Sequence, residues 1–306
     1  MSLGPDGAFI LIMLWPPSLR LLTLSLTALI FSACGSETAS DSISSQPSSL
    51  SSGGGGIPNI APPQVYGQSA IVIDARSGKV LYAKNADQRR PVASTQKIVT
   101  ALVALDAGSL NKPITIQTSD TRCEPTKLYL KPGEVYTRGY LTKALMVKSG
   151  NDVARALARD LGGSQEGFSA LMNRKAASLG MRNSYFINPN GLPAPGQYST
   201  ARDIAIAARV AYRSSTMRSW TNTERYTFQF ANGRTKVLEN TNKLLKRVPY
   251  CDGMKTGTTN RAGRCLVSSG TFNGRSAIAV VLKSNSTHIW NDSERLLRWA
   301  LESPRR

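Results

Sequence analysis

The chain has 306 residues, of which 41% are hydrophobic, so it is long and apolar enough to bury a sizeable core. Its 38 Lys and Arg residues outnumber its 19 Asp and Glu residues. The resulting formal net charge of +19 predicts attraction to polyanions such as nucleic acid, anionic lipid or an acidic cell wall. One His and a few scattered Cys residues do not suggest a metal site, and no cofactor is expected.

The N-terminal residues have the pattern of a secretory signal. Arg20 precedes an apolar run over residues 21–31, and two small residues come directly before Cys34. A Cys at the cleavage point resembles bacterial lipoprotein signals, in which that Cys is lipidated. We therefore interpret residues 1–34 as a signal peptide with lipidation at Cys34, which places the protein outside the cytoplasm, tethered to a membrane of the bacterial cell envelope and away from nucleic acid. The alternatives are an ordinary signal peptide and an uncleaved anchor.

Two regions follow this signal. Residues 35–62 are rich in Ser, Gly and Pro, a composition that cannot bury a core and that predicts a flexible linker. Residues 63–306 show neither an internal repeat nor a second linker, and they predict one folded domain. The domain contains Cys123, Cys251 and Cys265, an odd number of thiols, so disulfide bonding stays open.

The folded domain is expected to have strands at both ends and helices between them. Ser77-Gly78 and Asn273-Gly274 each predict the turn of a hairpin. The apolar spacing predicts strands over 70–75, 79–83, 264–271 and 276–283, and helices over 94–107, 142–146, 153–161, 168–179, 203–212 and 292–302. This order predicts an α+β fold in which both ends of the domain form one antiparallel sheet, flanked by helices and with a helical lobe inserted.

The first candidate for chemistry is Ser94, with Lys97 three residues later on the same face of a predicted helix. A Ser hydroxyl becomes a nucleophile when a base takes its proton, and burial lowers the pKa of a Lys so that its neutral amine can be that base. The pair alone is a weak signal, because Ser109 and Lys112 repeat the spacing without chemical context. The alternative is that Ser94 caps the helix and Lys97 is a solvated charge.

Two further motifs favour the chemical interpretation. Ser149-Gly150-Asn151 lies between two predicted helices, in a loop that could place a hydroxyl and an amide at a cleft. Lys255-Thr256-Gly257 follows a predicted strand, and a Lys and a Thr on an edge strand can hold a carboxylate. Taken singly, the two motifs are also typical of an ordinary turn and an ordinary strand end.

Together, the order Ser-x-x-Lys, Ser-x-Asn, Lys-Thr-Gly resembles the low-molecular-mass penicillin-binding proteins, the serine-type D-alanyl-D-alanine carboxypeptidase family. The likeness runs from about Gln68 to Leu301 and includes Lys131-Pro132-Gly133, residues 188–192 and residues 199–203. It implies the β-lactamase/transpeptidase-like fold, with residues 63–306 as a penicillin-binding D,D-peptidase domain.

The resemblance implies catalytic roles for five residues. Ser94 is the acylated nucleophile and Lys97 its base. Ser149 relays a proton to the leaving D-Ala nitrogen or back for deacylation. Asn151 donates a hydrogen bond to the substrate amide carbonyl, and Lys255 orients the network and supplies positive potential.

Substrate binding is implied for four more residues. Thr256 contacts the terminal carboxylate, and Gly257 lets the ligand backbone approach closely. The backbone N–H of Thr258 and that of the nucleophile form an oxyanion hole. Arg202 attracts the carboxylate or, alternatively, forms a salt bridge with Asp203.

The expected activity is removal of the terminal D-Ala from peptidoglycan stem peptides through an acyl-enzyme, with β-lactam antibiotics as covalent inhibitors. A D,D-endopeptidase that cleaves peptidoglycan crosslinks is the first alternative, because the chain ends directly after the predicted terminal helix. The residues Ser149-Gly150-Asn151-Asp152 look more like the carboxypeptidase branch, which we favour.

Three other classes fit less well. A class A β-lactamase needs a Glu-x-x-Leu-Asn segment, and Glu166 does not continue in that pattern. A Ser-His-Asp hydrolase would have to use His288, the only His, which lies near a predicted helix start and is expected to be structural. A non-catalytic wall-binding lipoprotein would bind stem peptides without releasing D-Ala.

Overall fold

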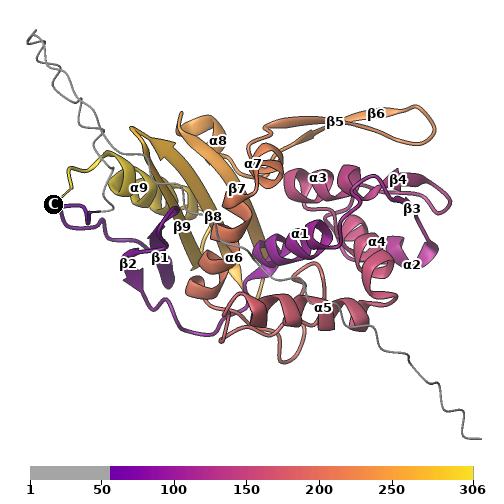
Figure 1. Ribbon diagram of the computed structural model, residues 1–306, viewed down its shortest axis with the longest axis horizontal. Helices are drawn as coiled ribbons and strands as arrows, with labels where there is room; N and C mark the ends of the chain where they lie inside the picture. Colours follow the sequence, from indigo (N-terminus) through magenta and orange to yellow (C-terminus); the bar gives the residue numbers. More distant parts are fainter. Residues whose placement is uncertain (1–55, 306) are drawn as a thin grey trace, which may run out of the picture. The chain divides into compact units, whose positions relative to one another are not determined.

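A five-stranded antiparallel sheet joins the two ends of the folded region (Figure 1). The computed structural model describes residues 56–305. The strand order is β2-β1-β9-β8-β7. The strands are β1 (Ser69–Asp74), β2 (Val80–Lys84), β7 (Cys251–Thr259), β8 (Gly263–Phe272) and β9 (Arg275–Ser284). Both predicted hairpins are confirmed, and positive φ angles at Asn273 and Gly274 make the tight turn between β8 and β9.

Helices cover both faces of this sheet (Figure 1). Helix α9 packs on β8 and β9 from one side, and α6 packs on β1 and β9 from the other. The helices are α1 (Lys97–Asp106), α2 (Thr118–Thr121), α3 (Arg138–Lys148), α4 (Asn151–Gly162), α5 (Gln165–Ser178), α6 (Ala201–Arg213), α7 (Ser215–Thr221), α8 (Leu244–Arg247) and α9 (Ile289–Glu302). Helices α2 to α5 form the inserted lobe, so the predicted α+β arrangement is confirmed.

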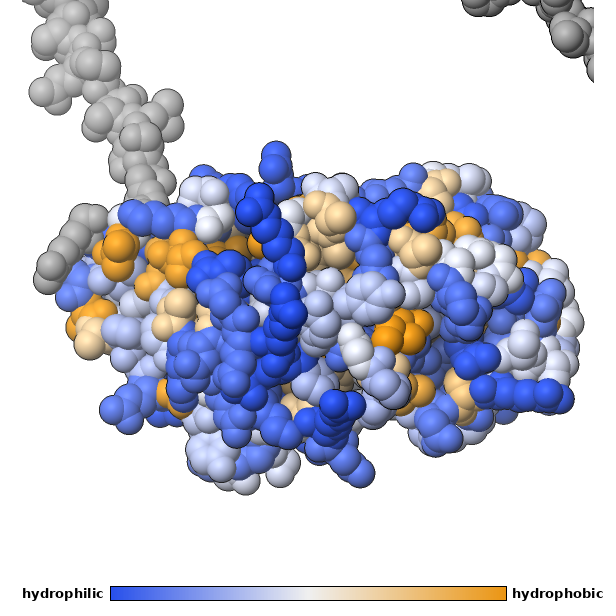
Figure 2. All heavy atoms as spheres, turned by 90° about the horizontal axis from the view of Figure 1, so that it is seen from below, coloured by the Kyte–Doolittle hydropathy of each residue, from blue (hydrophilic) through white to orange (hydrophobic). Residues whose placement is uncertain are grey.

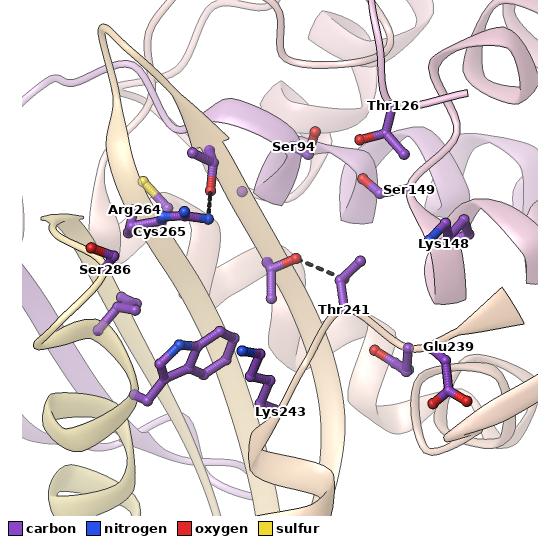
Figure 3. A pocket seen from close by; sticks show the side chains of 16 residues that line it. Ser94, Thr126, Lys148, Ser149, Glu239, Thr241, Lys243, Arg264, Cys265 and Ser286 are labelled. Carbon is purple, nitrogen blue, oxygen red and sulfur yellow. Dashed lines mark hydrogen bonds between the residues drawn. The ribbon is translucent and has the colours of Figure 1, made fainter. Parts of the chain in front are cut away.

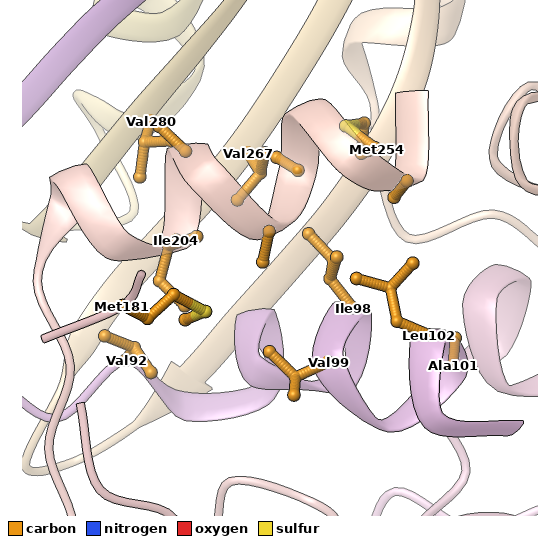
Figure 4. Close-up of a cluster of buried hydrophobic side chains, with 14 of the residues drawn as sticks. Val92, Ile98, Val99, Ala101, Leu102, Met181, Ile204, Met254, Val267 and Val280 are labelled. Atoms are coloured by element: carbon orange, nitrogen blue, oxygen red, sulfur yellow. The ribbon is translucent and has the colours of Figure 1, made fainter. Parts of the chain in front are cut away.

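Helix α1 is buried between the sheet and the lobe (Figure 4). Its side chains Ile98 and Leu102 are almost completely buried, in one cluster with Ile204 of α6 and with Val267 and Val280 of the sheet. Each fully buried aliphatic side chain contributes roughly 1.5–3 kcal/mol relative to exposure. This apolar packing holds the N-terminal end of α1, where the first sequence motif lies, in a fixed position between the two parts of the fold.

The folded domain begins earlier in the chain than the sequence indicates. Residues 57–62 were predicted to belong to the flexible linker, but they pack along the end of α9. The Asn59 N–H donates to the Pro304 carbonyl oxygen at 3.0 Å, and Trp299 Nε1 donates to the Ile60 carbonyl oxygen at 2.9 Å. The predicted linker is therefore too long at its C-terminal end, because composition does not reveal these distant partners. The rest of the linker to residue 55, the predicted signal and Cys34 lie outside the described residues.

Two small two-stranded sheets were not predicted in the middle of the chain. Strands β3 (Pro113–Thr115) and β4 (Val135–Thr137) pair beside α4. Strands β5 (Arg225–Gln229) and β6 (Thr235–Glu239) pair in an extended hairpin that packs on α3. Phe228 of β5 packs on Tyr140 of α3, with ring centroids 4.8 Å apart, and so holds this hairpin against the helix. Short strands of this kind are specified by aromatic contacts with α3, which local periodicity does not show.

The surface reflects the basic composition. On the face shown in Figure 2, hydrophilic residues predominate and hydrophobic ones form only small patches. Within residues 56–305, no helix combines the length and hydrophobicity needed to cross a bilayer. Cys123, Cys251 and Cys265 are all free thiols, so the question left open by the sequence is answered for these three residues.

Candidate active site

Ser94 lies in a short 3-10 turn, η1 (Ala93–Gln96), that leads directly into α1. The sequence predicted one continuous helix starting at Ser94, and this boundary is wrong by about one turn. Tertiary contacts are the reason, because Ala93 has a positive φ of 48° and a Cβ on Gly191 would lie only 2.1 Å from the Ala93 carbonyl oxygen. In the same loop, the Asn190 carbonyl oxygen accepts a hydrogen bond from Ser94 Oγ at 3.2 Å.

Lys97 is completely buried, and its amine is surrounded by four oxygen atoms. Its Nζ lies 2.9 Å from Ser94 Oγ and 2.7 Å from Asn151 Oδ1. It also lies 3.0 Å from the carbonyl oxygen and 3.3 Å from Oγ of Ser149. A neutral amine can donate to the Asn151 and Ser149 carbonyl oxygens while its lone pair accepts from a hydroxyl. The amine can therefore exchange a proton with either Ser hydroxyl without moving.

Burial is the main influence on the charge state of Lys97 and Lys255. Burial holds the pKa of Lys97 well below its usual range, and the nearby charge of Lys255 lowers that pKa further. The Asp152 carboxylate acts in the opposite direction on the pKa of Lys97, with a smaller effect. Burial also lowers the pKa of Lys255 to about 7. Burial and the neighbouring cation thus both shift Lys97 toward its neutral amine, which is the form that can accept a proton.

Asn151 does not have the geometry that the sequence analysis assigned to it. Its Nδ2 donates to the carbonyl oxygens of Glu124 at 2.9 Å and of Pro125 at 3.0 Å, and its Oδ1 faces Lys97. Both amide hydrogens are thus engaged, so the expected hydrogen bond to a substrate carbonyl is not supported. Asn151 instead fixes the position of the Lys97 amine and of the loop that contains Glu124 and Pro125.

Asp152 supports the same loop, which is a role that the sequence analysis missed. Its carboxylate accepts hydrogen bonds from the backbone N–H groups of Leu128, Tyr129 and Leu130. The carboxylate is buried, and these donors compensate for its desolvation. The signal was present in the sequence as the residue directly after the second motif, but the segment that it holds is brought near only by the fold.

A cleft of about 500 Å³ opens above these buried groups (Figure 3). Ser94 and Ser149 both face it, whereas Lys97 and Lys255 lie beneath its floor. The lining residues are Ser94, Thr126, Lys148, Ser149, Glu239, Asn240, Thr241, Lys243, Thr256, Gly257, Thr258, Arg264, Cys265, Ser286, Ile289 and Trp290. The three sequence motifs therefore meet at one cleft between the edge of the sheet and the helical lobe.

Strand β7 forms the sheet side of this cleft and carries the third motif. The Thr256 hydroxyl donates to Thr241 Oγ1 at 2.7 Å, and Arg264 Nη1 donates to Thr258 Oγ1 at 3.1 Å. Neither Thr241 nor Arg264 was singled out by the sequence analysis, because each comes from a segment without a motif. Arg264 is exposed in the cleft, so a cation is available on this wall.

Gly257 is required for a different reason than the predicted approach of a ligand. A Cβ at this position would lie 2.9 Å from the Ser94 backbone nitrogen and 3.0 Å from that of Thr95. The first distance is shorter than real Cβ contacts and the second is at their lower limit, so a side chain would push β7 away from η1. The glycine is therefore explained by the protein's own backbone. It lets the edge strand approach the nucleophile closely enough for both to border one cleft.

Arg202 is not brought to this cleft. Its guanidinium forms a bidentate pair with Asp87, with Nε 2.7 Å from Oδ1 and Nη2 2.9 Å from Oδ2. The predicted contact with a substrate carboxylate is therefore not supported, and the alternative partner Asp203 is also wrong. His288 stacks on Tyr66 with ring centroids 4.2 Å apart, and it does not itself line the cleft.

No group of three or more His, Cys, Asp and Glu side chains is suitably placed to hold a metal ion within residues 56–305. Comparisons with known proteins identify the family of the chain. The family model of D-alanyl-D-alanine carboxypeptidases matches residues 58–286. The chain belongs to this family. Its motifs at Ser94, Ser149 and Lys255 therefore lie within the matched region.

Individual relatives support the family and the fold. The chain is 37% identical over 224 residues to the D-alanyl-D-alanine carboxypeptidase DacF of Bacillus subtilis, which covers 72% of this chain and 58% of that protein. It is 34% identical over 238 residues to a D-alanyl-D-alanine endopeptidase of Pseudomonas aeruginosa, with 76% of each covered. The crystal structure of a D-alanyl-D-alanine carboxypeptidase from Mycobacterium tuberculosis matches with a TM-score of 0.75 and 33% identity, over 79% of this chain and 94% of that one. The β-lactamase/transpeptidase-like fold expected from the sequence is thereby confirmed.

Proposed function

We propose that this protein is a serine-type D-Ala-D-Ala carboxypeptidase that removes the terminal D-Ala from peptidoglycan stem peptides. The observation that supports this most is the 2.9 Å contact between Ser94 Oγ and the Nζ of a completely buried Lys97. Family membership supplies the substrate class, because the matching relatives are D-alanyl-D-alanine peptidases. The cleft supplies the place where a peptide end would lie beside the nucleophile.

In the first step, the Ser94 hydroxyl turns from the Asn190 carbonyl oxygen toward Lys97, and the neutral amine takes its proton. Ser94 Oγ then forms a bond to the carbonyl carbon of the penultimate D-Ala. The carbon–nitrogen bond to the terminal D-Ala breaks, and the leaving nitrogen receives a proton from Ser149, which Lys97 replenishes. A water oxygen then bonds to the acyl carbon while Lys97 and Ser149 take its proton. The bond to Ser94 Oγ breaks, Lys97 returns a proton to that oxygen, and the stem peptide leaves one residue shorter.

Two sets of groups would bind the substrate around this centre. The backbone N–H groups of Ser94 and Thr258 are proposed as the oxyanion hole, because β7 lies close to η1 at Gly257. The Thr256 hydroxyl is proposed to contact the terminal carboxylate. Arg264 lies on the same wall and supplies the cation that Arg202 cannot provide.

The place and inhibitors of the enzyme follow from the same proposal. Peptidoglycan lies outside the cytoplasm, so we propose that the protein acts in the cell envelope, with lipidation at Cys34 as its anchor. β-Lactams resemble the D-Ala-D-Ala end, so we propose that they acylate Ser94. Because no Glu-x-x-Leu-Asn segment is available to activate water, the adduct should persist rather than turn over.

The decisive experiment is incubation with purified muropeptides, pentapeptide monomers and crosslinked dimers together, followed by product analysis. We expect D-Ala release from the monomers. When the protein is mixed with penicillin instead, intact mass should show a long-lived adduct. Both signals should be lost in the Ser94→Ala variant. Cleavage of dimers without D-Ala release would assign the endopeptidase activity that the Pseudomonas relative has by name. Rapid multiple turnover of penicillin would assign a β-lactamase. Binding of muropeptides without cleavage would contradict the enzymatic proposal.

A further inference from the structure

A second cavity, of about 570 Å³, lies where α6 and the start of α7 meet the β1–β2 turn and the β8–β9 hairpin. We call it the arginine cavity. It is lined by Ala75, Arg76, Arg209, Tyr212, Arg213, Arg218, Thr271 and Ser276. None of these residues lines the catalytic cleft, and none is used by the proposed reaction. The proposed reaction therefore does not explain this cavity.

Arg209 is the most firmly held of the four arginines. Its guanidinium donates to the backbone carbonyl oxygens of Ala75 at 3.3 Å and of Arg76 at 2.6 Å. Gly78, with a positive φ of 80°, packs against it, since a Cβ there would lie 3.1 Å from Arg209 Cζ. Backbone carbonyls orient this guanidinium but do not neutralise it, so its full charge remains at the wall of the cavity.

The other three arginines keep their charge in the same space. Arg76, Arg213 and Arg218 are all exposed. Among the ion pairs found within residues 56–305, none involves any of the four arginines. Arg218 lies over the ring of Tyr212, with Cζ 5.6 Å from the ring centroid. This contact orients the guanidinium while leaving its N–H groups available.

Hydroxyl groups form a polar floor below these cations. The Tyr212 hydroxyl lies 2.6 Å from Thr271 Oγ1, which in turn lies 2.9 Å from Ser276 Oγ. Hydroxyls arranged in a chain can turn to donate to an anion or to accept from one another. The cavity thus offers two kinds of donor group, guanidinium and hydroxyl, to one ligand.

The nearby carboxylates compensate only part of this charge. Asp252 accepts hydrogen bonds from Tyr212 at 3.0 Å and from Ser269 at 2.5 Å, and it does not line the cavity. Asp74 is buried and accepts from the N–H groups of Arg76 and Ser77. Each carboxylate keeps its charge, but neither lines the cavity, and the arginines outnumber the two carboxylates, so the cavity carries an excess of positive charge.

We propose that the arginine cavity is a binding site for a phosphate group of an anionic ligand. A phosphate offers several oxygens and up to two negative charges in a compact shape, which suits several planar guanidinium forks at once. A single carboxylate, with two oxygens and one charge, would leave most of these donors unused. Such a site would hold the enzyme to a phosphate-bearing surface or molecule without blocking the catalytic cleft.

The test uses the full chain and inorganic tripolyphosphate, titrated calorimetrically at roughly 0.15 M salt, where diffuse surface attraction is screened beyond about 8 Å. One variant combines Arg76→Gln with Arg213→Gln. The matched control combines Arg174→Gln with Arg182→Gln, two exposed arginines outside the cavity, so both variants lose the same charge. Penicillin adduct formation should be unchanged in both variants, which shows that they are folded.

We expect saturable one-to-one binding that weakens more than about tenfold in the cavity variant and less than about twofold in the control. Vesicles of phosphatidylglycerol then distinguish the source of the phosphate. If they compete with tripolyphosphate, the ligand is a lipid headgroup, and if they do not, it is a soluble phosphorylated molecule. Equal weakening in the two variants, or no saturable binding by the wild type, would show diffuse charge only and overturn the proposal.

Discussion

The catalytic cleft and the arginine cavity both use cations, but they treat them in opposite ways. In the catalytic site, Lys97 and Lys255 are completely buried and lack a direct carboxylate partner. In the arginine cavity, three of the four arginines are exposed and the fourth is half-buried. The first arrangement makes the ammonium form costly, and the second leaves the charge intact.

The difference shows how residue type and burial together decide what a basic side chain does. A buried Lys can lose its proton and become a base, because its ordinary pKa is within reach of desolvation. An Arg remains charged in almost any protein environment, so it is suited to holding an anion. A +19 chain can therefore contain both a proton acceptor and an anion site without conflict between them.

The largest effect is expected from replacing the buried base. Lys97→Met removes the proton acceptor while keeping a flexible apolar side chain of similar length. The rate of penicillin acylation should fall by at least about a thousandfold, as expected when a base of this kind is lost. Stopped-flow or intact-mass kinetics measure that rate, and thermal unfolding checks that the fold persists. A folded variant that keeps a near-normal acylation rate would show that another group activates Ser94.

A smaller effect is expected from the second buried amine. The charge of Lys255 lowers the pKa of Lys97, so Lys255→Met should raise that pKa and move the acidic limb of the acylation rate to higher pH. The shift should be on the order of one pH unit, the scale of a close like-charge interaction. Lys243→Met is the matched control, since this exposed lysine lines the same cleft. An equal shift in both variants would mean that general charge, rather than Lys255, sets the pKa of Lys97.

The stability of the fold should also depend on Lys255 and pH. Burial lowers its folded-state pKa to about 7 from an ordinary value of 10.5, so between these values the unfolded state binds more protons. The free energy of unfolding contributed by this group should therefore rise as pH increases from 7 to 10.5. The slope is at most about 1.4 kcal/mol per pH unit, which amounts to a few kcal/mol in all.

Urea unfolding of the wild type and of Lys255→Met across this pH range measures the effect. The difference between the two free energies of unfolding isolates the contribution of Lys255 together with its coupling to Lys97, because the remaining titrating groups cancel. The wild type should gain on the variant as pH rises. Parallel curves would show that Lys255 titrates normally in the folded state. The contrast between buried and exposed cations would then no longer hold for Lys255.

Much of the fold could be predicted from local patterns. The terminal hairpins, the main helices and the α+β order follow from turn residues and apolar spacing, which are properties of short segments. The hairpin β5–β6 and the packing of residues 57–62 on α9 could not be predicted, because they depend on partners far along the chain. The same holds for the 3-10 turn at Ser94, whose shape depends on the loop at Gly191.

For the candidate active site, the sequence alone identified the motifs that meet at the cleft, because Ser-x-x-Lys, Ser-x-Asn and Lys-Thr-Gly are local spacings. Only the tertiary structure decided what several of them do. Asn151 holds Lys97 instead of facing a substrate, Gly257 makes room for η1, and Arg202 pairs with Asp87 outside the cleft. The physical reason is that a hydrogen-bonding group acts on whatever the fold places about 3 Å away, and that neighbour is not written in the adjacent residues.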